Sequence, residues 1–111
     1  MDSILTSIKK LLGITEEYDD FDADVIMHIN SVFMTLRQLG IGPEQGFSIS
    51  DGSAIWADFI PEDSTLEAVK SYVYLKVRLL FDPPQNSFVI ESINRQINEF
   101  EWRLNVAAES L

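Results

Sequence analysis

The sequence LEAVKSYVYLKVRLLFDPPQNSFVIESINRQINEFEWRL, residues 66–104, contains two segments in which apolar residues recur every three or four positions. This spacing places side chains on one face of an α-helix. The first segment has its apolar positions at Leu66, Val69, Tyr72, Val73, Val77 and Leu80. The second has them at Ile90, Ile93, Ile97, Phe100 and Leu104. Between them, Asp82-Pro83-Pro84 predicts a turn and hence a helical hairpin, because proline cannot continue a helix and restricts the residue before it.

The starts of both helices carry capping signals. Ser64 and Glu67 form a capping box, in which each side chain accepts a hydrogen bond from the other residue's backbone amide. Asn86 or Ser87 can cap the second helix in a similar way. These residues predict where the hairpin helices begin.

Two further helices precede the hairpin. In residues 4–12 the apolar stripe leaves Lys9 and Lys10 off the core face. Ser3 or Asp2 can cap the start of this helix, and Gly13 can end it in the left-handed conformation. Residues 22–39 carry the most regular stripe of the chain, which ends before Gly40. This stripe consists of Val25, Ile26, Ile29, Val32, Phe33, Leu36 and Leu39.

Residues 41–63 are irregular and rich in turn signals, including Gly42-Pro43 and Asp51-Gly52. The segments 47–50 and 53–56, which flank Asp51-Gly52, match a β-hairpin template. The alternative is a long ordered loop with one helical turn around residues 54–59, capped by Asp51 or Ser53. We favour the loop because the neighbouring elements are all helical.

The predicted fold class is therefore all-α. We expect one domain, residues 1–111, with four helices and a long ordered loop between the second and third, a short β-hairpin at 47–56 being the alternative. With 46% hydrophobic and 23% charged residues, the chain has the composition of a globular protein. No apolar run is long enough to cross a bilayer, and the N-terminus lacks the basic flank of a signal peptide, which predicts a soluble, cytoplasmically made protein.

The charge and the residue types exclude several functions. A formal charge of −10 disfavours sequence-specific DNA binding, although an acidic wall would let DNA slide past without sticking. There are no cysteines, and the single histidine, His28, has no partner for catalysis, so we read it as a packing residue. The sequence predicts no enzyme, no cofactor and no metal.

Residues 16–24, EEYDDFDAD, hold six acids. The alternation Asp20, Asp22, Asp24 has the form of the start of a calcium loop, but Val25 and Ser31 stand where that loop needs glycine and glutamate. A solvated acidic linker that caps the next helix is the favoured interpretation.

Several side chains are candidates for contact with a neighbouring subunit. Trp56 and Phe59 either anchor the loop on the core of their own chain, which we favour, or reach a partner. Lys70, Tyr74 and Arg78 fall one turn apart as a basic-aromatic stripe, either solvated or able to dock acidic residues. Arg95 and Trp102 lie off the core face of the last helix, where Trp102 packs on the loop or forms an interface.

The ordered combination of several segments resembles the head-tail connector (adaptor) proteins of tailed bacteriophages. These segments are residues 2–14 (DSILTSIKKLLGI), 29–33 (INSVF), 39–43 (LGIGP), 72–84 (YVYLKVRLLFDPP) and 98–104 (NEFEWRL). The resemblance implies a helical subunit that forms a ring, of twelve copies, under the portal in the neck of the virion. Such a ring extends the DNA channel and receives stopper or tail-completion proteins, without sequence-specific DNA binding and without a membrane.

Carried onto this chain, the resemblance implies that the end of the last helix reaches the portal. The portal-contact candidates are Trp102, Arg103, Val106 and Leu111. The acidic run supplies the channel-lining candidates, which are Glu16, Glu17, Asp19 and Asp20. Two other classes stay open: an acidic regulatory module that masks a basic partner, and a metal-dependent enzyme that uses the acidic run.

Overall fold

The computed structural model describes residues 3–61 and 64–109 and contains, within them, five helices and no strand. The helices are α1 (Ile4–Leu11), α2 (Asp22–Gln38), α3 (Trp56–Phe59), α4 (Ser64–Phe81) and α5 (Ser87–Glu109). The all-α prediction is confirmed. The four long helices are those expected from the sequence, and α3 is the single helical turn expected inside the loop. The alternative of a β-hairpin at 47–56 is wrong, since an isolated bridge between Ser3 and Ile55 is the β-type pairing found there.

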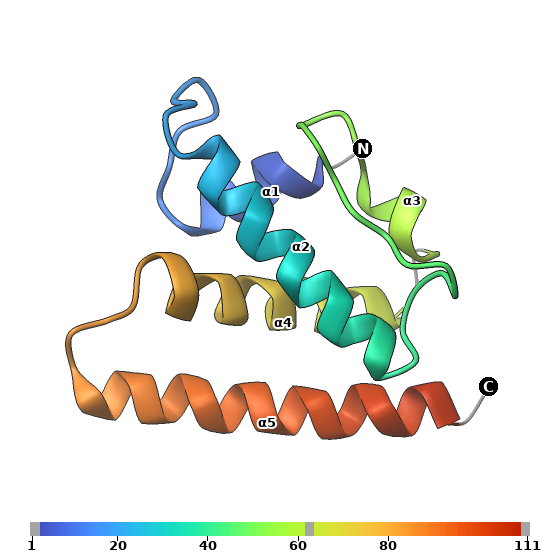
Figure 1. The fold of residues 1–111 in the computed structure, drawn as a ribbon. Coiled ribbons are helices and arrows are strands. Elements are labelled where there is room, and N and C mark those ends of the chain that lie inside the picture. The colour runs from blue at the N-terminus through green and yellow to red at the C-terminus, as the bar shows by residue number, and fades with distance from the viewer. Residues whose placement is uncertain (1–2, 62–63, 110–111) are drawn as a thin grey trace.

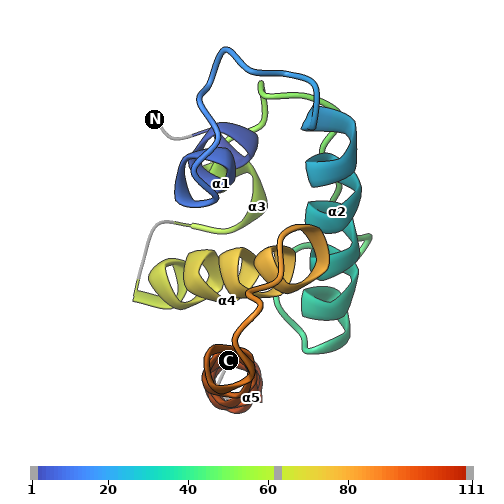
Figure 2. The same cartoon turned by 90° about the vertical axis from the view of Figure 1, so that its left-hand side faces the viewer.

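Helix α4 is the centre of the molecule (Figure 1). Helix α5 runs antiparallel to α4 along one side of it, so that the two form the predicted hairpin. Helices α1 and α3 lie on the opposite side of α4, and α2 crosses α4 along a third side, where it also contacts α1 (Figures 1 and 2). In Figure 2, seen nearly along its axis, α5 forms a separate outer layer beneath α4.

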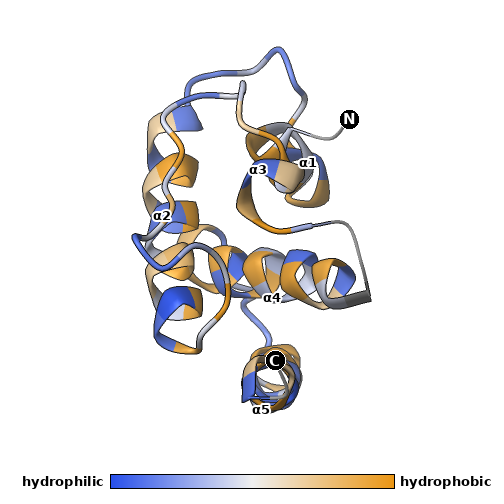
Figure 3. Ribbon diagram, turned by 90° about the vertical axis from the view of Figure 1, so that its right-hand side faces the viewer, coloured by the Kyte–Doolittle hydropathy of each residue, from blue (hydrophilic) through white to orange (hydrophobic). Residues whose placement is uncertain are grey.

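The core fills the space that α1, α2, α3 and α4 surround, where hydrophobic residues gather in Figure 3, and it continues between α4 and α5 through buried residues of α5. The largest fully buried side chains are Ile4, Ile8, Val25, Ile29, Val32, Phe33, Leu36, Val69, Tyr72, Val73, Val77 and Leu104. Most of the predicted core positions are thus buried. Leu80 is an exception, with 53% of its surface exposed, because α4 ends one residue later, beyond its neighbours; Leu75, which was not predicted, is buried instead.

The ends of the helices follow the local sequence signals. The Ser3 hydroxyl accepts a hydrogen bond from the Thr6 amide at 3.2 Å and caps α1. Gly13 ends α1 with a φ of +83°, a conformation that glycine adopts at little cost. The Asn86 carboxamide caps α5 by accepting from the Phe88 amide at 2.8 Å. The side chain of Ser64, and with it the predicted capping box, lies outside what the structure describes.

A side chain of α2 holds the loop between α2 and α3. The Asn30 amide group donates to the Ile49 carbonyl at 2.9 Å and accepts from the Ile49 amide at 2.8 Å. A two-way pair of this kind imitates a β-ladder and fixes an irregular segment without a second strand. Ile49 is buried as a result.

The start of α3 is capped differently from the expectation. The Asp58 carboxylate accepts a hydrogen bond from the Ile55 amide at 3.0 Å, whereas Asp51 and Ser53 were the predicted caps. Asp51 instead closes its own turn by accepting from the Ser53 amide at 2.8 Å and from the Ser53 hydroxyl. These hydrogen bonds lower the pKa of Asp51. The prediction of Asp51 or Ser53 as the cap was wrong because the local turn satisfies both residues.

Candidate assembly surfaces

The outer face of α5 carries the predicted candidates Arg95, Trp102 and Val106, and all three are exposed. Trp102 has 67% of its surface exposed, so it does not pack on the loop. Arg103 is exposed too and forms an ion pair with Glu99 one turn earlier, at 2.6 Å. The sequence therefore identified correctly which side of α5 faces away from the core. Leu111, the fourth portal-contact candidate, lies outside the described residues.

Another exposed side chain of α5 was not singled out from the sequence. Phe88 stands at the start of the helix with 79% of its surface exposed, the largest fraction among the large hydrophobic residues described. Position 88 lies two heptads before position 102, so Phe88, Arg95 and Trp102 follow one line along the outer face. The heptad spacing was the signal that could have found it.

The basic-aromatic stripe on α4 exists, but it makes contacts within its own chain. The Lys70 ammonium lies 5.9 Å from the centre of the Trp56 ring, a cation–π distance. The Arg78 guanidinium donates to the Tyr74 hydroxyl at 3.2 Å. All three stripe residues are half-buried. Tyr74 and Arg78 line a groove of about 220 Å³ beside the end of α1, a concave strip rather than a flat solvated face.

Trp56 and Phe59 are buried in the core, with 2% and 5% of their surfaces exposed. The Phe59 ring stacks on Phe33 of α2 with centroids 4.5 Å apart. The indole N–H of Trp56 donates to the Ser7 hydroxyl at 2.9 Å. Their side chains anchor the loop on its own chain, as in the favoured interpretation, and they do not offer a surface to a neighbour.

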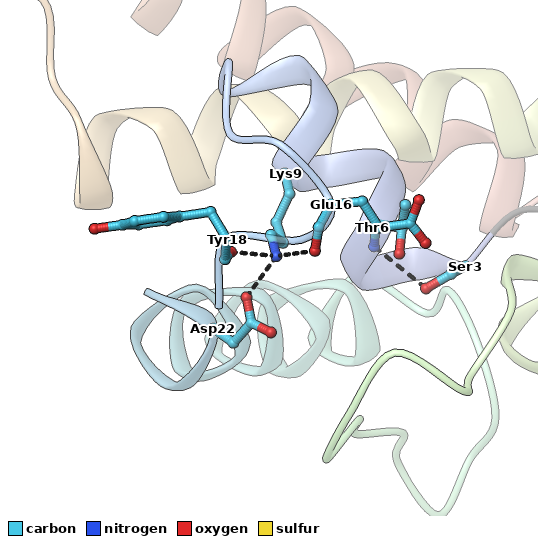
Figure 4. A network of polar contacts seen from close by, with 6 residues as sticks. All are labelled: Ser3, Thr6, Lys9, Glu16, Tyr18 and Asp22. Carbon is cyan, nitrogen blue, oxygen red and sulfur yellow. Dashed lines mark hydrogen bonds and ion pairs between the residues drawn. The ribbon is translucent and has the colours of Figure 1, made fainter. Parts of the chain in front are cut away.

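A buried lysine organises the acidic linker between α1 and α2 (Figure 4). Lys9 is only 3% exposed, although the sequence placed it off the core face of α1. Its ammonium donates to the carbonyls of Glu16 at 3.1 Å and Tyr18 at 2.7 Å, and it forms an ion pair with Asp22 at 2.8 Å. Lysine is rarely buried without such partners. The prediction of Lys9 as an off-core residue was wrong, because its partners lie seven to thirteen positions away.

The carboxylates of this linker face outwards, apart from Asp22. The channel-lining candidates Glu16, Glu17, Asp19 and Asp20 are all exposed. The linker is therefore an ordered acidic surface whose backbone, rather than its side chains, binds Lys9. No group of three or more His, Cys, Asp or Glu side chains arranged to hold a metal ion occurs in the residues that the structure describes.

A polar cluster ties α5 to α4. The Tyr72 hydroxyl donates to Glu101 at 2.7 Å, and the Lys76 ammonium lies 3.9 Å from the same carboxylate oxygen. Burial, together with the neighbouring Glu101 carboxylate, raises the pKa of the Tyr72 phenol. His28, read from the sequence as a packing residue, is half-buried with its ring 6.4 Å from that of Phe81.

An apolar pocket of about 410 Å³ opens beside the C-terminal end of α5. Ala107 and Ala108 form one wall, and the segments 40–43 and 59–61 and Thr65 form the others. No charged residue lines it. No sequence pattern predicts this pocket, because its walls come from four separate segments.

The chain is a small helical protein that exposes large apolar and charged side chains on the outer face of α5. The family model described as phage connector protein matches residues 4–110, so the chain belongs to the phage connector protein family. Membership of this family indicates a structural role, as a connector component of the phage particle. No curated protein and no solved structure matches the chain. Among the described residues, no helix is long and apolar enough to span a membrane.

Proposed function

We propose that the chain forms a homo-oligomeric ring of twelve copies beneath the portal in the neck of the virion. The ring extends the DNA channel and links the capsid to a stopper or tail-completion protein. Each chain contributes one domain, residues 1–111, and performs no catalysis. Family membership supports this proposal, and the outer face of α5 is the observation that carries it furthest.

A protein that worked alone would have little use for this face. Large side chains that remain exposed on one helix face are candidates for interaction sites, and tryptophan is enriched where interfaces hold most of their binding energy. The outer face of α5 combines Phe88, Trp102 and Val106 with Arg95, a residue also common at interfaces. We assign this face to contacts with neighbouring subunits, and its C-terminal part, from Trp102 onwards, to the portal.

The half-buried stripe on α4 suits a second subunit contact. The groove that Tyr74 and Arg78 line is concave, and it holds both the Arg78 cation and the Asp82 carboxylate. A neighbouring subunit can pair a carboxylate with Arg78 and a cation with Asp82.

The acidic linker suits the wall of a DNA passage. Exposed carboxylates at positions 16, 17, 19 and 20 repel phosphates, so DNA would pass without being retained. Lys9 holds the linker backbone in place, so these charges would keep fixed positions around a channel.

The test is the mass of the free protein, followed by its mass together with its portal ring, with electron microscopy of the complex. The proposal expects an added ring-shaped layer at the exit of the portal. A portal that gains no such layer would contradict it. Capture of a basic host protein, with no binding to the portal, would favour the acidic regulatory module instead.

A further inference from the structure

We propose that Phe88 of one copy of this chain inserts into the apolar pocket at the other end of α5 in the next copy. The inference rests on the proposed ring and names the contact that links its subunits. Two features that the sequence did not reveal carry it: the most exposed large hydrophobic side chain described, and the uncharged pocket that Ala107 and Ala108 border.

Phe88 is a projecting apolar group. Its amide is held by the Asn86 cap, so the first turn of α5 fixes the position of its backbone. Its ring is 79% exposed, and Val89 beside it is also exposed. A phenyl group left in water at the first turn of a capped helix gains from burial in any apolar recess of suitable size.

The pocket has a suitable size and lining. An apolar cavity of roughly 150 Å³ is enough to bind benzene. The pocket measures about 410 Å³ and therefore has room for the phenyl ring and part of a neighbouring side chain. Its walls include Phe59, the last residue of α3, and Ile60, whose backbone amide donates to the Trp56 carbonyl of α3. Gly42 at its edge has a φ of +94°, and a Cβ there would lie 2.5 Å from the Phe59 ring, so only glycine leaves that ring in place.

The distribution of charge favours a second copy as the occupant. Two chains that each carry −10 repel one another over most of their surfaces. Residues 83–90 contain no charged side chain, and neither does the lining of the pocket. Contact between these two uncharged regions opposes fewer like charges than contact through the acidic linker, so it costs less.

The positions of the two features determine the kind of assembly. Phe88 lies in the first turn of α5 and the pocket borders its last turn. The two ends of α5 stand at opposite edges of the molecule (Figure 1). At a rise of about 1.5 Å per residue, positions 88 and 107 are roughly 29 Å apart along the axis, so a chain cannot fill its own pocket. A contact between two different surfaces repeats head to tail, and it closes into a ring when the rotation between copies allows.

Cysteine cross-linking tests the contact directly, because the chain has no cysteine of its own. In the double variant Val89→Cys with Ala107→Cys, which keeps the Phe88 ring beside the new cysteine, oxidation of the assembled protein should give a ladder of covalent oligomers on a denaturing gel. The proposed contact predicts that each single variant, which has no partner cysteine opposite it, stays monomeric under the same oxidation. A ladder in the double variant with monomeric single variants then shows that the two positions come from adjacent copies, whereas dimers of the single variants would show pairing between like positions and would contradict the contact.

A second measurement does not depend on disulfide geometry. We expect Phe88→Lys to weaken self-association on the portal by roughly ten-fold or more, with an unchanged thermal unfolding midpoint. The matched control is Met34→Lys on α2, where a side chain 65% exposed is replaced in the same way. We expect the control to assemble as the wild type does.

The outcomes separate this inference from the proposed function. A wild-type ring that forms on the portal, with no ladder and with equal assembly of the two lysine variants, overturns the Phe88 contact and leaves the ring intact. Equal loss of assembly in both lysine variants also overturns it. If the wild type adds no layer to the portal, the ring itself is refuted and the contact falls with it.

Discussion

Replacing Lys9 by methionine should destabilise the fold far more than the same change at the adjacent Lys10. Methionine keeps the apolar stem and removes the ammonium. Three contacts are then lost, to the carbonyls of Glu16 and Tyr18 and to the carboxylate of Asp22. The Oδ1 atom of Asp22 is buried and has no hydrogen-bond partner besides this ion pair, so the variant leaves it without compensation.

The size of the effect follows from that environment. Removing one partner of a buried ion pair costs roughly 3–5 kcal/mol. The Asp22 side chain is 30% exposed and gains some hydration in the variant, so we expect the lower end, about 3 kcal/mol. For a chain of this length that loss corresponds to a fall of about 10–15 °C in the unfolding midpoint.

Urea unfolding followed by circular dichroism measures this free energy. Lys10 is exposed, and Lys10→Met should change the stability by less than about 0.5 kcal/mol. Asp22→Asn tests the pair from the other side, and Lys9→Met should cost less in that background than in the wild type. If Lys9→Met and Lys10→Met unfold at the same urea concentration, the role given to Lys9 is refuted.

Three further predictions concern the loop, the outer face of α5 and the cluster between α4 and α5. Asn30→Ala should cost about 2 kcal/mol in urea unfolding, because both hydrogen bonds to Ile49 are lost; an unchanged midpoint would mean that the loop holds itself. Trp102→Ala should leave the thermal midpoint of the free chain within about 2 °C and weaken assembly on the portal; a large fall in the midpoint would make it a core residue. The raised pKa of Tyr72 means that the folded chain keeps this phenol protonated at a pH where the unfolded chain ionises it, so wild-type stability should fall as the pH rises above about 10. Tyr72→Phe should reduce that fall, and parallel pH profiles for the two proteins would contradict the assignment.

The helices were predictable because their signals are local. These signals are the apolar spacing, the caps Ser3 and Asn86, and the proline pair. Each acts between residues within one or two helical turns, which are close in space because they are close in sequence. Leu80 shows the limit of periodicity, which marks the face of a helix but does not say where the neighbouring helix stops covering it.

The features that failed prediction depend on contacts between distant positions. Lys9 looked like a surface residue, since its partners are backbone carbonyls, which carry no residue type that a sequence pattern could reveal. The hydrogen bonds between Asn30 and the loop, and the pocket beside Ala107, likewise depend on residues that are distant in the sequence. Of the candidate surfaces, those on one helix face were found, and those assembled from several segments were not.

The way Lys9 binds the linker has a consequence for electrostatics. Lys9 contacts two main-chain oxygens and a single carboxylate, so the other carboxylates of residues 16–24 are not neutralised by it. A flexible tail with the same composition would sample many conformations, so its time-averaged electrostatic field would be diffuse. Here an internal cation anchors the backbone, so the exposed carboxylates project from fixed positions on the chain. Repeated around a symmetry axis, such a pattern would give a field whose shape is fixed by the fold.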